Sequence, residues 1–159
     1  MAEKLTIIED SREQSPLDFS GFRGVDTIRQ GLKTADYSLQ GYEDTICFER
    51  KSVQDTVGTL VSGHTRFLRE LDRMKPFEEK YILIEHSPTT LFTYCMRHGW
   101  QRKFDTIIQS LLAYVHHYQV HVRFCKDRAD MADYIVRKSR DFLKRKGEQN
   151  GAQEKTDTD

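Results

Sequence analysis

The chain has 159 residues, 31% of them charged and 37% hydrophobic, and its 25 basic and 25 acidic side chains give a formal net charge of zero. This length suits one domain with a single core. No apolar run approaches the roughly 20 residues of a membrane span, and no leader resembles a signal peptide, so we expect a cytoplasmic protein, or a nuclear one in a eukaryote, with no membrane partner.

The first part of the chain predicts two strands separated by a loop. Residues 4–8 form a short apolar segment that leads into the polar stretch 9–13. The loop covers residues 14–24, and its two phenylalanines are expected to pack on the core, with base stacking as the alternative. A second strand is predicted over 25–33, as a neighbour of the hairpin that follows.

The stretch 36–55 predicts a β-hairpin, because two apolar segments flank a turn-rich linker. Asp36 stands at the head of the first segment, and the second segment ends in a Glu-Arg-Lys run. Side chains alternate across a strand, so Glu49 and Lys51 are expected to share one face while Arg50 lies on the other.

Helical spacing resumes directly after the hairpin. The apolar side chains over 53–61 and 67–74 predict two short helices or one kinked helix. The continuous apolar run 81–84 then predicts a central strand that is covered on both faces.

The last part of the chain continues the alternation of helices and strands, which indicates a mixed α/β sheet. Residues 87–101 have no clear pattern and leave a lid, a DNA-contacting loop and an oligomer contact open. Apolar spacing predicts a helix over 104–118 and a half-buried strand over 120–124. Asp127 is expected to open a last helix, and the polar tail 147–159 is predicted to be disordered.

The hairpin brings together groups that suit the hydrolysis of a phosphodiester. Mg²⁺ commonly takes one or two carboxylates together with phosphate and water, and Asp36 and Glu49 supply two carboxylates. Lys51 would lie beside the ion, where a cation orients or helps to deprotonate the attacking water. The spacing D(x)12-E-x-K is a loose version of the PD-(D/E)xK nuclease pattern. The alternative is a solvated strand on which acidic and basic side chains alternate.

Several separated motifs of this chain have counterparts in a known family. The run ERKSVQD at 49–55, preceded by ADY at 35–37, is similar to the signature GDX(n)ERKXXXD, and EDSREQ at 9–14 is similar to an upstream D-x-R-E. These motifs resemble the nuclease domain of the XPF family of structure-specific DNA endonucleases. Two later stretches resemble the helix and the strand that follow in that family, namely GHTRFLRELDRM (63–74) and YILIE (81–85).

The resemblance, which covers about residues 5 to 145, implies a fold and an activity. The fold is a restriction-endonuclease-like mixed β-sheet flanked by helices, of α/β class, in a nuclease domain over 1–146. The activity is that of a Mg²⁺- or Mn²⁺-dependent endonuclease acting on branched or flapped DNA, in DNA repair or recombination. Relatives pair through this domain, so the resemblance also implies a homodimer or heterodimer.

The resemblance assigns roles to individual residues. The metal-binding and catalytic carboxylates are Asp10, Glu13, Asp36 and Glu49, and the catalytic amine is Lys51. From the residues alone, Asp10 would be interpreted as part of a turn after the first strand.

Arginines supply the predicted contacts to DNA. The resemblance implies that Arg12, Arg50 and Arg66 engage phosphate. Helical phase places Arg66, Arg69 and Arg73 away from the apolar stripe, a geometry suited to a DNA backbone, with an ordinary solvated face as the alternative.

Two features at the ends of the hairpin have structural interpretations. Ser52 and Asp55 have the Ser-x-x-Asp form of a helix capping box, and a role for Asp55 around the metal is an equal alternative. Ala35 stands where the family has Gly, and we expect this to alter the freedom of the backbone next to Asp36 without loss of chemistry.

Neither the cysteines nor the histidines form a metal-binding pattern. The three cysteines are widely separated and fit reduced, buried thiols, and the clustered histidines straddle a predicted helix-to-strand turn without a carboxylate or thiolate pattern nearby. These residues are Cys47, Cys95 and Cys125, and His116, His117 and His121.

Three functions are therefore distinguished. The first is the metal-dependent endonuclease. The second is a catalytically silent, DNA-binding scaffold or partner subunit of the same fold, which the family also contains. The third is a small α/β protein whose charged hairpin is only a solvated edge. Retention of every motif carboxylate favours catalysis over the scaffold.

Overall fold

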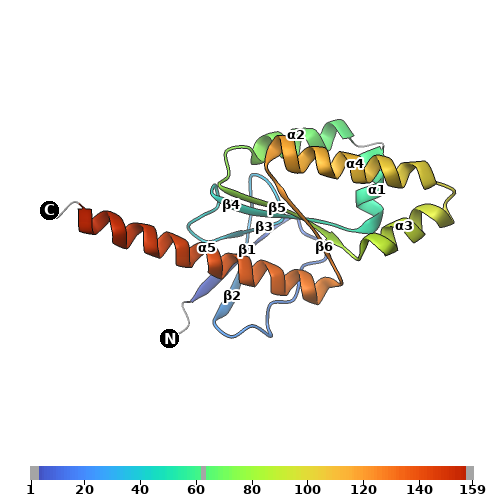
Figure 1. Ribbon diagram of the computed structural model, residues 1–159. Coiled ribbons are helices and arrows are strands. Elements are labelled where there is room, and N and C mark those ends of the chain that lie inside the picture. Colours follow the sequence, from blue (N-terminus) through green and yellow to red (C-terminus); the bar gives the residue numbers. More distant parts are fainter. Residues whose placement is uncertain (1–3, 62–63, 157–159) are drawn as a thin grey trace.

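The computed structural model describes residues 4–61 and 64–156. Within these residues a six-stranded mixed sheet has helices on both faces (Figure 1). The strands are β1 (Leu5–Asp10), β2 (Val25–Gln30), β3 (Tyr37–Leu39), β4 (Ile46–Lys51), β5 (Glu79–Glu85) and β6 (His121–Cys125). The helices are α1 (Val53–Val61), α2 (His64–Met74), α3 (Pro88–Arg97), α4 (Gln101–Tyr118) and α5 (Arg128–Thr156).

The strand order, β2-β1-β3-β4-β5-β6, determines which chain segments meet. The predicted hairpin is the antiparallel pair β3 and β4, while β4, β5 and β6 run parallel to one another. β1 is antiparallel to β3, so it runs in the same direction as β4. The carboxyl ends of β1, β4 and β5 therefore lie at the same edge of the sheet, together with the start of β3.

The second predicted strand is shorter than expected and has a different neighbour. β2 ends at Gln30 and pairs in parallel with β1 at the edge of the sheet, so it does not contact the hairpin as a neighbouring strand. Its exposed side chains are typical of an edge position.

The sheet separates two hydrophobic clusters. Ile82 and Ile84 of β5 belong to the cluster covered by α1, α2, α3 and α4, whereas Tyr81 and Leu83 belong to the cluster on the α5 face. This alternation confirms the prediction of a central strand buried on both faces. The loop residue Phe19 is also buried in the α5-face cluster, as the packing interpretation predicted.

Residues 87–101 contain a helix that the sequence did not reveal. Ser87 caps α3, because its Oγ accepts the backbone N–H of Thr90 at 3.2 Å, and Pro88 occupies the first turn, where its missing N–H is not needed. Three threonines in this segment lower its helical propensity, which explains why the pattern was unclear.

The prediction of a disordered tail is wrong for residues 147–156, which continue α5. The segment is rich in Glu, Gln and Lys and contains no proline, so its local propensity supports a helix without an apolar face. Residues 157–159 lie outside the described part of the chain. Among the described residues, no helix has the length and apolar character needed to cross a bilayer.

Candidate active site

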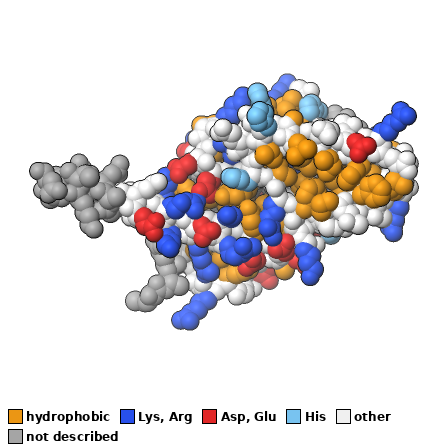
Figure 2. All heavy atoms as spheres, viewed as in Figure 1, with side chains coloured by type: hydrophobic (Ala, Val, Ile, Leu, Met, Phe, Trp, Pro, Cys, Tyr) orange, Lys and Arg blue, Asp and Glu red, His pale blue; other side chains and the backbone are white. Residues whose placement is uncertain are grey.

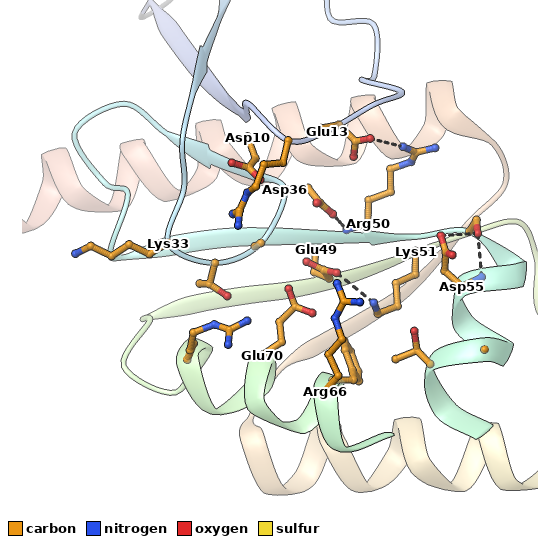
Figure 3. Close-up of a pocket in the computed structure, with 18 residues that line it drawn as sticks. Asp10, Glu13, Lys33, Asp36, Glu49, Arg50, Lys51, Asp55, Arg66 and Glu70 are labelled. Carbon is orange, nitrogen blue, oxygen red and sulfur yellow. Dashed lines mark hydrogen bonds and ion pairs between the residues drawn. The ribbon is translucent and has the colours of Figure 1, made fainter. Parts of the chain in front are cut away.

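A cavity of about 640 Å³ opens at the sheet edge where β1, β3 and β4 meet, and α2 forms its opposite wall (Figure 3). All but one of the residues predicted for the site contribute to its lining. These are Asp10, Arg12, Glu13, Asp36, Glu49, Arg50, Lys51, Ser52, Asp55, Arg66 and Arg73. The exception is Arg69, which is exposed on α2 outside this cavity.

Asp36 is held between β1 and β4 by three hydrogen bonds. Its backbone N–H donates to the carbonyl of Phe48 at 3.0 Å, and its carbonyl accepts the N–H of Asp10 at 2.8 Å. Its carboxylate Oδ2 accepts the backbone N–H of Arg50 at 2.8 Å. The side chain therefore has a fixed position beside the end of β4.

The residue before Asp36 has the backbone conformation expected of a glycine. Ala35 has a φ of 64°, in the left-handed region where a Cβ costs about 1 kcal/mol or more. The turn before Asp36 therefore has a left-handed residue although Ala35 carries a Cβ, and the expected effect on backbone freedom and chemistry stays a prediction.

Glu49 and Lys51 form a buried pair on the face predicted for them. Lys51 Nζ lies 3.1 Å from Glu49 Oε1, and the two side chains are 9% and 8% exposed. Lys51 Nζ also lies 4.3 Å from the ring centroid of Phe67 on α2, in a cation–π contact. The amine is therefore fixed next to the carboxylate at the base of the cavity.

Glu70 is a site residue that the sequence analysis missed. It lies on α2 and points toward Glu49 (Figure 3), with which it shares a hydrogen bond. A signal was available, because Glu70 is four residues after Arg66 and three before Arg73, so the three share one face of the helix. Only the arginines of this face were selected from the sequence.

Crowding of carboxylates in this buried place raises their pKa values. Burial raises the pKa of Asp36 to about 6. Burial also raises the pKa of Glu49 well above its ordinary range; the Asp36 carboxylate raises it further, whereas Lys51 opposes the shift and Glu70 adds to it. The site thus disfavours full ionisation of its own carboxylates, a condition that a bound cation would relieve.

Asp10 connects the end of β1 to the segment before β3. Its Oδ1 accepts the backbone N–H of Leu32 at 3.0 Å, and its Oδ2 pairs with Arg12 Nε at 2.8 Å. Arg12 in turn donates to the carbonyl of Leu32 at 2.8 Å. Both oxygens of Asp10 have protein partners, so its carboxylate is fixed at the cavity wall, and its role toward a metal stays a prediction.

Arg50 is committed to protein oxygens on the face opposite Glu49. It donates to Glu85 at 3.0 Å and to the carbonyl of Ser15 at 2.8 Å, and it lies 3.5 Å from Glu13. Burial disfavours its charge, but the bonds to Glu85 and Glu13 hold its pKa above the ordinary value. Glu13 and Arg50 therefore meet each other at the wall of the cavity that also holds Asp36 and Glu49. The predicted roles of Arg50 toward phosphate and of Glu13 toward a metal stay predictions.

The capping box predicted at the start of α1 is present. The N–H of Asp55 donates to Ser52 Oγ at 3.0 Å, and Ser52 Oγ donates to Asp55 Oδ2 at 2.8 Å. The cap positions α1 directly after the strand that carries Glu49 and Lys51. Asp55 also lines the cavity, so its role around a metal stays a prediction.

A comparison with protein families matches the ERCC4 domain over residues 9–138, which is most of the chain. The chain belongs to the ERCC4 domain family. This confirms the resemblance to the XPF family that the motifs indicated.

Solved structures share the fold of this ERCC4 domain. XPF from Aeropyrum pernix has a TM-score of 0.71 and 21% identity, and the match covers 92% of this chain and 69% of that one. A complex of the same protein with DNA has a TM-score of 0.68 and 23% identity, covering 90% and 66%. The predicted α/β fold class is therefore confirmed. A search of curated proteins finds no match.

The four carboxylates predicted to bind metal in this ERCC4 domain, Asp10, Glu13, Asp36 and Glu49, line one cavity. The described residues contain no group of three or more His, Cys, Asp and Glu side chains arranged to hold a metal ion, so the four-carboxylate ligand set stays a prediction. Asp36 and Glu49 supply two carboxylates, and Mg²⁺ is commonly held by one or two carboxylates with water and phosphate. Two hard oxygen donors whose pKa values are raised by crowding fit Mg²⁺ or Mn²⁺.

Replacing Arg50 with Met is expected to destabilise the ERCC4 domain by about 3 kcal/mol, because Glu13 and Glu85 would lose their cation in a buried place. The three side chains are only 12–13% exposed. Urea unfolding at pH 7 measures the change. The matched control is Arg137→Met, which breaks an exposed pair with Asp133 and should change stability by less than about 1 kcal/mol. Equal effects of the two substitutions would contradict the assigned role of Arg50.

Proposed function

We propose that this ERCC4 domain is a Mg²⁺- or Mn²⁺-dependent endonuclease that hydrolyses DNA phosphodiester bonds, with branched or flapped DNA as the substrate. The observation that carries the proposal is the buried Glu49–Lys51 pair beside Asp36 at the base of an open cavity. Family membership and the fold shared with XPF from Aeropyrum pernix, which has been solved in complex with DNA, add support.

Each residue of the site has a role in the proposed reaction. Asp36 and Glu49 would hold the ion, which when bound polarises phosphate oxygen and activates water. Lys51, fixed between Glu49 and Phe67, orients the attacking water and offsets negative charge near the phosphorus.

Substrate contacts come from α2 in this proposal. Arg66 and Arg73 line the cavity on the wall opposite Asp36, where they face a phosphate placed above the carboxylates. Arg69, which is exposed outside the cavity, would meet the backbone farther from the cleaved bond. Arg12 is 70% exposed beside the cavity and keeps an outward-facing edge of its guanidinium for phosphate.

The test is a cleavage panel of end-labelled DNA with a flap, a fork, a four-way junction or a plain duplex, run with Mn²⁺ or Mg²⁺. We expect cleavage of the flap or fork that stops when the metal is chelated. Cleavage of none of the substrates by protein that still binds Mn²⁺ would exclude the endonuclease.

The second candidate is a catalytically silent DNA-binding scaffold or partner subunit. One observation favours it: the described residues contain no group of three or more His, Cys, Asp and Glu side chains arranged to hold a metal ion. The scaffold predicts binding of branched DNA with no turnover under any metal condition, so the same panel, read by binding as well as cleavage, separates the two.

Pairing with a second copy or a related subunit is a further part of the proposal. Apolar side chains gather on the face that carries α3 and α4 (Figure 2), and the exposed large ones are Phe92, Met96, Leu112 and Val115. Exposed apolar patches of this kind are typical of interaction sites. We expect light scattering of the parent protein to give twice the monomer mass, and light scattering of the Leu112→Glu variant to give the monomer mass. A monomeric parent protein would contradict homodimerisation.

A further inference from the structure

A second groove, of about 650 Å³, lies next to the active-site cavity. It opens beyond the carboxyl ends of the parallel strands β4 and β5, between the start of α1 and the length of α3. Ser52 lines both the cavity and the groove, so the two adjoin at this residue. Crevices outside the carboxyl ends of parallel strands are where ligands bind in open α/β sheets.

The lining of the groove is unlike that of the active-site cavity. No Asp or Glu is among its lining residues, which include several hydroxyl side chains from α3 and its cap, together with Arg97. Arg97 is exposed and has no ion-pair partner in the part of the chain that the structure describes. The first turns of α1 and α3 also line the groove, and helix N-termini favour anions. Hydroxyls, an unpaired guanidinium and helix N-termini are the groups that bind a phosphate backbone.

An aromatic group also belongs to the groove. Tyr94 and His98 line it, with ring centroids 4.3 Å apart, and the His98 ring stacks on Trp100 at 4.8 Å. Lys103 Nζ lies over the Trp100 ring, 4.0 Å from its centroid. Aromatic and imidazole rings beside a phosphate-binding track are typical of surfaces that bind single strands, because unpaired bases present a π-face.

The backbone at His86 supports a functional interpretation of the groove. His86 follows β5 directly, lines the groove and has a φ of 83°, a left-handed conformation that a histidine adopts at a cost of about 1 kcal/mol or more. This turn leads the chain from the central strand β5 into α3, whose hydroxyl side chains line the groove.

We propose that this groove binds a single-stranded arm of the DNA substrate as it leaves the cleaved phosphate. The inference rests on the proposed function, and it adds that the chain binds the single-stranded part of the substrate in this groove. The strand would pass Ser52, follow the hydroxyls of Thr89 and Thr93, pair a phosphate with Arg97 and stack a base on His98. A duplex buries its base faces, so it could use the phosphate-binding groups of the groove but not its aromatic group.

The experiment measures binding of a fluorescein-labelled single strand of about 20 nucleotides by anisotropy at several salt concentrations. All proteins carry Glu49→Gln, so that binding is read without cleavage. Adding Arg97→Gln is expected to weaken binding roughly threefold to tenfold at low salt, and to reduce the slope of log K against log salt by about 0.7, the loss of one phosphate contact to a single strand. Adding His98→Ala is expected to weaken binding about tenfold with an unchanged salt slope, because stacking is not ionic.

The matched control is Lys144→Gln, an exposed cation on α5 that is far along the sequence from the groove. It should leave affinity and slope unchanged. The inference would be overturned by equal losses of affinity with Arg97→Gln and Lys144→Gln, or by an unchanged salt slope with Arg97→Gln. It would also be overturned if His98→Ala weakened binding of a duplex of equal length as much as binding of the single strand. Cleavage of flapped DNA at the parental rate by the Arg97→Gln single variant would contradict the role of the groove and leave the proposed endonuclease standing. Strand binding without any cleavage by the parent protein would contradict the endonuclease and leave the role of the groove standing.

Discussion

Replacing Glu49 with Gln is expected to abolish DNA cleavage while making the metal-free protein more stable. Glu49 is one of the carboxylates proposed to hold the ion, and loss of such a group costs on the order of 10³-fold or more in rate. Its raised pKa shows that burial and the Asp36 carboxylate oppose its charge in the folded state. A neutral amide of the same shape removes this repulsion, and its carbonyl oxygen can still accept a hydrogen bond from the buried Lys51, so the melting temperature should rise with the metal chelated.

The companion variant is Lys51→Met, which is also expected to be inactive but less stable. Its loss leaves Glu49 without the cation at 3.1 Å and leaves the Phe67 ring without its cation–π partner. Opposite stability changes with equal loss of cleavage would show that both groups act in the reaction and not through the fold. Measurements are flap cleavage with Mn²⁺ and thermal melting with chelator.

The control for both is Glu43→Gln, which neutralises a carboxylate in the turn between β3 and β4, outside the cavity. It should change neither cleavage nor melting. Parental cleavage by either Glu49→Gln or Lys51→Met would exclude the proposed assignment of the site.

The sequence predicted the centre of the site because strand geometry leaves little freedom there. Alternation within β4 puts Glu49 and Lys51 on one face, and the hairpin returns Asp36 to the same edge. Helices with a strong apolar stripe, such as α4, were predicted for the same reason.

The errors arise where partners come from segments distant in the sequence. Alternation placed Arg50 on the opposite face correctly, but nothing local indicated that Glu13 and Glu85 would both meet it there. The carboxylate of Glu70 was missed because the arginines around it on α2 suggested a DNA-facing surface only. Nothing local indicated that the backbone of Leu32 and the side chain of Arg12 would both bond to Asp10, whose role toward a metal stays a prediction.

Helix boundaries without an apolar stripe were the other source of error. The segment after Gly147 was predicted to be disordered because it has no periodicity, yet a helix already formed by packing of its first half on the sheet can continue into polar residues of good propensity. α3 shows the converse case, in which a proline, a serine cap and three threonines conceal a helix that tertiary packing on α4 stabilises.

Mn²⁺ is expected to raise the melting temperature, and to do so more at pH 8 than at pH 5. Asp36 has its pKa raised by burial from 3.8 to about 6, so between these values the unfolded chain is ionised while the folded chain still binds the proton. The unfolded state then binds fewer protons, and the stability of the metal-free protein falls as pH rises through this window. A metal ion binds the ionised form, and its binding therefore opposes this loss most strongly above pH 6.

The size of the effect follows from mass action. At a Mn²⁺ concentration a hundredfold above Kd, binding to the folded state alone adds about 2.7 kcal/mol. For a domain of this size, that corresponds to a rise of about 5 to 10 °C in Tm. Melting curves at pH 5 and pH 8, each with chelator and with Mn²⁺, give the four Tm values from which the Mn²⁺ shift at each pH is calculated.

Asp36→Asn serves as the matched variant, because it keeps a side-chain oxygen for the Arg50 N–H at 2.8 Å but neither ionises nor holds a cation well. It should flatten the stability loss between pH 4 and pH 6 and abolish most of the Mn²⁺ shift at pH 8. A Mn²⁺ shift of the same size in Asp36→Asn would place the ion elsewhere, and a shift equal at pH 5 and pH 8 would mean that the buried carboxylates are not its ligands. Because melting requires no DNA and no turnover, this result applies equally to the endonuclease and to the silent scaffold, and it tests the metal site independently of the reaction.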